Sequence, residues 1–121
     1  MMITGTARDT ELAKLGLTEA LVKLTQGEFV HEDLAFRCRA LRYSLEPEDF
    51  SPPGVDVIPL WEGESSITGF YLADAKAHFI TYDIEDIDIP ESIGDSIADL
   101  IHYLAAEYGE DEGQLKAVLW R

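Results

Sequence analysis

A proline-rich break at residues 46–54 (EPEDFSPPG) constrains the fold more than any other feature of this sequence. Proline fixes φ and has no main-chain N–H, so neither a helix nor a strand can run through three prolines and a glycine. Helical patterning precedes the break and strand patterning follows it. The break is too short to separate domains, and 121 residues with 46% hydrophobic side chains suit one core. We therefore interpret residues 1–121 as a single domain.

Two helices are predicted before the break. Leucines recur at near-helical spacing over residues 10–25, and Gly16 inside this stretch is expected to split or kink the helix. Residues 31–45 carry a second apolar stripe, which predicts another helix. Cys38, the only cysteine, lies on that stripe and is interpreted as a buried, inert thiol.

Three strands are predicted after the break. Residues 55–61 are rich in β-formers, but Pro59 limits this strand to a sheet edge or a bulge. Residues 67–72 and 77–84 are rich in aromatic and β-branched side chains. The link between them, residues 73–76, is short enough for a hairpin, which favours an antiparallel meander.

An acidic connection over residues 85–91 follows the last predicted strand, and Pro90 marks its end. Residues 92–108 then carry an apolar stripe at i, i+3, i+4, i+7 and i+11, which predicts a helix capped by Ser92 or Asp95. Residues 115–120 are expected to form a last strand or a docking turn. The fold class predicted from this order is α+β, a mostly antiparallel sheet with helices packed on one face.

Motifs for catalysis or metal binding fail on their spacing. Residues 63–69 (GESSITG) lack the G-x-S-x-G elbow, and the three histidines are too dispersed to chelate a metal. Counted from Asp83 as a calcium loop, position six is Asp88 where glycine is required, and position twelve is Gly94 where glutamate is required. We predict no catalytic residue, metal or cofactor. A small hydrolase or metal-dependent enzyme stays as the third alternative, and it would need His78 or His102 gathered with carboxylates.

The net charge of −15 is unevenly placed. Residues 1–42 carry six basic and six acidic side chains, whereas residues 43–121 carry three basic and 18 acidic ones. Such a surface repels nucleic acid and anionic membranes and attracts a basic protein. The alternative is that the charge only keeps the protein soluble.

Five carboxylates concentrate this charge between the last predicted strand and the following helix, where isoleucines interleave with them. Like charges packed so closely destabilise the fold unless solvent or a cationic partner relieves them. We predict a partner-binding site here, with two tyrosines on neighbouring strands as aromatic anchors. The alternative is a solvated loop with its isoleucines tucked beneath it. The predicted site residues are Asp83, Glu85, Asp86, Asp88, Glu91, Tyr71 and Tyr82.

Four short segments share one further pattern: a Pro-Leu segment, two aromatic strands and a closing helix. They are residues 58–61 (IPLW), 69–72 (GFYL), 77–83 (AHFITYD) and 95–101 (DSIADLI). In these segments the chain resembles the SMI1/KNR4 family, also called the SUKH superfamily. The resemblance implies an α+β domain that binds other proteins. Many bacterial members resemble immunity proteins, which neutralise secreted toxins that are often nucleases.

The leading hypothesis is a non-catalytic, cytoplasmic immunity protein that neutralises a basic toxin by direct protein–protein binding. The cytoplasmic location is expected because one cysteine allows no internal disulfide and the N-terminus lacks a secretory pattern. A nuclease must be basic to hold nucleic acid, so an acidic inhibitor suits the same surface. The alternative, from a different class, is a regulatory or scaffold module that binds another protein.

Overall fold

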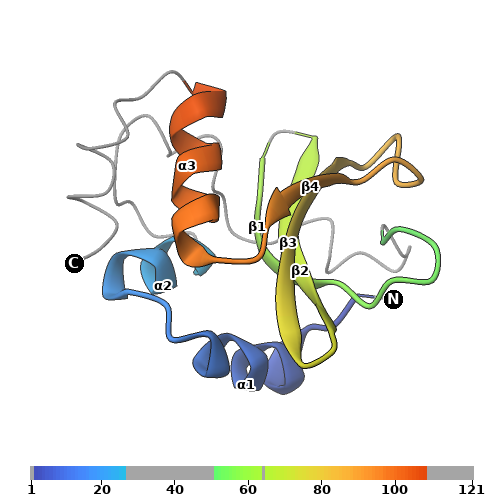
Figure 1. Ribbon diagram of the computed structural model, residues 1–121. Coiled ribbons are helices and arrows are strands. Elements are labelled where there is room, and N and C mark those ends of the chain that lie inside the picture. The colour runs from blue at the N-terminus through green and yellow to red at the C-terminus, as the bar shows by residue number, and fades with distance from the viewer. Residues whose placement is uncertain (1, 27–50, 64, 109–121) are drawn as a thin grey trace.

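The computed structural model describes residues 2–26, 51–63 and 65–108, and in them four strands form one antiparallel sheet beside three helices (Figure 1). The sheet order is β1-β2-β3-β4, which follows the chain and confirms the predicted α+β meander. The predicted helix over 31–45 and the stretch 115–120 lie outside the described residues. The elements are α1 (Gly5–Leu15), α2 (Glu19–Thr25), β1 (Ile58–Glu62), β2 (Ser66–Ala73), β3 (Lys76–Asp83), β4 (Glu91–Gly94) and α3 (Ile97–Tyr108).

Gly16 splits the N-terminal helical segment, as predicted. It adopts the left-handed conformation, with φ 68°, and ends α1. Thr18 then caps α2, since its hydroxyl oxygen accepts from the main-chain N–H of Leu21 at 3.3 Å. The predicted start at residue 10 was wrong, because α1 begins at Gly5. The first turns of α1 lack an apolar period, and the residue of α1 that is buried is Arg8.

Pro59 lies in an edge strand and beside a bulge, which confirms both parts of that prediction. Among the described strands β1 pairs with β2 alone, and its register shifts between Pro59 and Trp61. An edge position tolerates proline because no neighbouring strand needs the missing N–H.

The β2–β3 hairpin is closed by the two residues Asp74 and Ala75. Both have positive φ, at 54° and 64°, as a two-residue type I′ turn requires. Above the turn, Phe70 and Phe79 lie directly opposite each other, with ring centroids 5.8 Å apart and tilted by 57°. This pair forms the centre of the sheet face toward α2 and α3.

The region after the acidic connection differs from its prediction. Residues 91–94 pair with β3 as β4, and the helix begins only at Ile97. Gly94 has φ 147°, a conformation that other residues rarely adopt, so a helix cannot pass through it. Ser96, not Ser92 or Asp95, caps α3: its hydroxyl oxygen accepts from the N–H of Asp99 at 3.1 Å.

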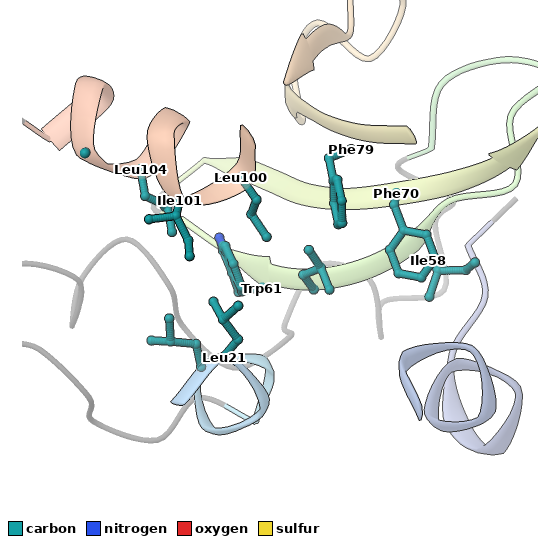
Figure 2. Close-up of a cluster of buried hydrophobic side chains, with 11 residues drawn as sticks. Leu21, Ile58, Trp61, Phe70, Phe79, Leu100, Ile101 and Leu104 are labelled. Atoms are coloured by element: carbon teal, nitrogen blue, oxygen red, sulfur yellow. The ribbon is translucent and has the colours of Figure 1, made fainter. Parts of the chain in front are cut away.

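Two groups of buried side chains form the core. The first cluster joins the two phenylalanines to α2 and α3, and the indole of Trp61 lies between Leu21 and Ile101 (Figure 2). The second cluster consists of Val57, Ile67, Ile80 and Tyr82. No helix in the described part of the chain is long and apolar enough to cross a membrane.

Candidate functional site

The five predicted carboxylates lie in residues 83–91, and from here on the term acidic connection refers to this whole segment. It runs from the end of β3 to the start of β4 and projects from the sheet on the side away from α3 (Figure 1). Asp83 organises its first turn, because one carboxylate oxygen accepts from the N–H of Glu85 at 2.8 Å and its carbonyl oxygen accepts from the N–H of Asp86 at 3.0 Å. A second turn follows, in which the N–H of Ile89 donates to the carbonyl oxygen of Asp86 at 3.1 Å. These consecutive turns hold the connection in a defined shape.

All five predicted carboxylates of the connection are exposed. No basic side chain pairs with any of them in residues 2–26, 51–63 and 65–108. Three ion pairs between described residues lie instead on α1 and α2, at Arg8–Asp9, Lys14–Glu11 and Lys23–Glu19. Within the described part of the chain, the connection is therefore a concentration of negative charge without a paired cation, and solvent ions screen it over about 8 Å at physiological ionic strength.

The three isoleucines of the connection divide into two roles. Ile84 and Ile87 are half-buried and pack against the second cluster, as the solvated-loop alternative expects. Ile89 is 74% exposed, although it is a large apolar side chain. An isoleucine left in water between Asp88 and Pro90 forfeits the free energy that burial would supply. The connection thus offers a partner one apolar side chain among five carboxylates.

Neither predicted aromatic anchor places an exposed ring beside the carboxylates of the connection. Tyr82 is 3% exposed within the second cluster, so it supports the connection from below and offers no ring surface to a partner. Tyr71 is half-buried and stacks on His78, with ring centroids 5.2 Å apart. It lies four residues along β2 from Ile67, the partner of Tyr82, which is about 13 Å at about 3.3 Å per residue. Sequence reasoning placed both tyrosines on neighbouring strands but not at their positions along them.

The histidines considered for an enzyme are not brought together. His78 shares the sheet face of Tyr71, and His102 is exposed on α3, which packs on the face of Phe70 and Phe79. The sheet therefore lies between the two imidazoles. In the described residues, no group of three or more histidine, cysteine, aspartate or glutamate side chains is placed to hold a metal ion.

Comparison with known proteins yields no match to a family model, to a characterised protein or to a solved structure. The segments that resemble the SMI1/KNR4 family occupy β1, the second half of β2, β3 and the first half of α3. The candidate site therefore rests on the geometry and charge of this chain.

Proposed function

We propose that this chain is a non-catalytic binding protein that engages a basic protein partner through the acidic connection. The observation that carries the proposal is the exposed Ile89 set among five exposed carboxylates. Exposed carboxylates or a single exposed apolar side chain are each ordinary on a protein surface, so the proposal rests on their combination in one short connection. Together they match a partner surface with an apolar patch inside a basic rim.

The two kinds of side chain would act at different stages of binding. The carboxylates attract a basic protein over the Debye length and raise the rate of encounter. Ile89 gains free energy only after contact, when the partner removes it from water. The half-buried Ile84 and Ile87 fix the connection on the sheet, so little conformational entropy is lost when a partner binds.

The more specific proposal is that the partner is a protein toxin, with a nuclease as one class that fits. Two features support it: the resemblance of four short segments to the SMI1/KNR4 family, and the sign of the charge. A nuclease carries basic side chains where it holds nucleic acid phosphates. An acidic protein seated on those side chains would block the substrate without any chemistry of its own.

A comparison of matched variants in pull-downs from lysate of the source cell tests the proposal. The test variant is Asp86→Asn with Asp88→Asn, and the control is Asp74→Asn with Glu19→Gln, which removes the same charge from exposed positions outside the connection. We expect the wild type and the control to retain one stoichiometric basic protein that is released as salt rises, and the test variant to lose it.

The outcomes separate the candidate functions. A retained protein that cuts nucleic acid, and is inhibited by this chain, would support the toxin proposal. A neutral or acidic protein retained equally by all three chains at high salt would contradict binding through the connection and favour a regulatory or scaffold module.

A further inference from the structure

The two edges of the sheet differ in how they are protected. At β1, Pro59 removes a main-chain donor, and the bulge twists the strand. The N-terminal segment also lies beside this edge: Met2 forms a parallel bridge with Val57, and the N–H of Ile3 donates to the carbonyl oxygen of Val57 at 2.8 Å. Another chain is therefore blocked from adding to β1.

At the opposite edge, β4 pairs with β3 alone within the part of the chain that the structure describes. Glu91 and Ser92 are exposed, and Ile93 and Gly94 are half-exposed. Pro90 removes one donor just before the strand, so the donors of this edge begin in β4 itself.

The hydrogen-bond pattern of the hairpin shows which residue of β4 faces outward. Antiparallel pairs alternate between those that exchange hydrogen bonds and those that do not. The N–H of Ile84 donates to the carbonyl oxygen of Ser65 at 2.9 Å, so this opposite pair is a hydrogen-bonded one. Every second residue back along β3 then also bonds to β2, and Ile80 is one of these residues. Ser92 lies opposite Ile80, so it directs its own N–H and C=O away from the sheet.

We propose that β4 accepts an extended segment of a basic protein as an additional strand, with Ser92 supplying the main-chain contacts. This inference rests on the proposed function and names the way in which the partner binds. Strand addition to an exposed edge is a recurring mode of peptide recognition. Here the acidic connection leads directly into the open edge, so a basic segment meets carboxylates and unpaired main-chain groups together.

A second copy of this chain is a poorer occupant of the same edge. Pairing two β4 strands would join two copies that each carry a net charge of −15. Like charges in such proximity oppose association. Because β4 is only four residues long, the added hydrogen bonds are few and set the direction and register of the segment, while the charges and Ile89 contribute the rest of the affinity.

Two synthetic peptides test the edge. One is a capped peptide of alternating lysine and valine, and the other is its fully N-methylated counterpart, which keeps every side chain and charge but has no main-chain donor. We expect the full chain to bind the first about tenfold more tightly, as one or two net hydrogen bonds imply. Ser92→Pro, which removes the outward N–H and places the proline ring at the edge, should weaken binding of the unmethylated peptide, and Ser92→Ala should not.

Each result has a separate meaning. Equal affinity of the wild type for both peptides, or no binding of either, would overturn strand addition. The wild type could prefer the unmethylated peptide while Asp86→Asn with Asp88→Asn leaves its affinity unchanged. That result would support strand addition at β4 and contradict a contribution of the acidic connection to binding. Analytical ultracentrifugation could show concentration-dependent dimerisation that Ser92→Pro abolishes. The edge would then bind a second copy of this chain, and the proposal of a basic segment would be overturned. The methylated peptide keeps the test decisive even if Ser92→Pro fails to fold.

Discussion

Arg8 of α1 donates a hydrogen bond from Nε to the carbonyl oxygen of Pro59 in β1, at 2.7 Å and across 51 positions of sequence. Its Nη2 donates to the carbonyl oxygens of Thr25 at 2.8 Å and Leu60 at 3.0 Å. These carbonyls lie at a bulge and at a helix end, where regular main-chain partners are missing. Burial lowers the pKa of the Arg8 guanidinium below its ordinary value, and Asp9 opposes the shift, but an arginine remains charged at neutral pH.

Replacing this arginine should destabilise the fold substantially. We expect Arg8→Met to lower the free energy of unfolding by about 2–4 kcal/mol, because three buried carbonyl groups lose their donor. Urea denaturation measures the loss. Lys14→Met is the control, since it breaks an exposed ion pair and should cost less than about 0.5 kcal/mol. Equal effects of the two substitutions would show that the Arg8 hydrogen bonds contribute little.

Gly69 is required by close approach of the main chain. A Cβ at this position would lie 2.6 Å from the carbonyl oxygen of Ile58 and 3.0 Å from Cα of Pro59. We expect Gly69→Ala to cost about 2–4 kcal/mol of unfolding free energy, because β1 must move away from β2. Gly16→Ala is the matched control: it has open space but a φ of 68°, so it should cost only about 1 kcal/mol. A smaller loss at Gly69 than at Gly16 in thermal unfolding would contradict the clash.

Ala75 holds a conformation in the hairpin turn that suits glycine better. Its φ of 64° places Cβ near the following carbonyl oxygen. We expect Ala75→Gly to raise the free energy of unfolding by about 0.5–1 kcal/mol, since relief of this strain exceeds the added entropy of the unfolded chain. Ala77→Gly, in the regular part of β3, should destabilise instead. A decrease in stability for both variants would argue against the type I′ turn.

The proposed binding site predicts two distinct kinetic effects, which surface plasmon resonance with the captured partner can measure. Asp86→Asn with Asp88→Asn should slow association several-fold at low salt and have little effect at high salt. Ile89→Ser should leave association unchanged and speed dissociation about tenfold, because the apolar contact forms only in the complex. If Ile89→Ser had no effect on dissociation, Ile89 would lie outside the interface.

Much of the fold was predictable because its determinants are local. Gly16 ends a helix through its own left-handed conformation, and Pro59 restricts its strand through its own missing N–H. The strand β4 was not predictable in this way. The predicted helix includes residues 92–94 and the predicted connection before it includes Glu91, and pairing with Phe79, Ile80 and Thr81 makes residues 91–94 a strand.

The candidate site also contains some residues whose exposure was predictable from the sequence and others whose exposure was not. Its carboxylates were predictable, since charged side chains in a connection between elements remain in water wherever the elements pack. The aromatic residues were not, because exposure of Tyr71 and Tyr82 depends on register and on which side chains cover that sheet face. Packing against the second cluster likewise decides that Ile84 and Ile87 are half-buried while Ile89 is exposed.

The sequence by itself determined the α+β class, the restriction of the Pro59 strand to an edge or a bulge, the interruption of the first helical segment at Gly16 and the acidic character of the connection. These follow from φ restrictions, from period-2 patterning and from charge, which act within a few residues. The tertiary structure alone decided the burial of Arg8, the pairing of β4, the exposure of Ile89 and the outward direction of Ser92. Each of these depends on groups distant in sequence that meet only when the sheet and helices pack together.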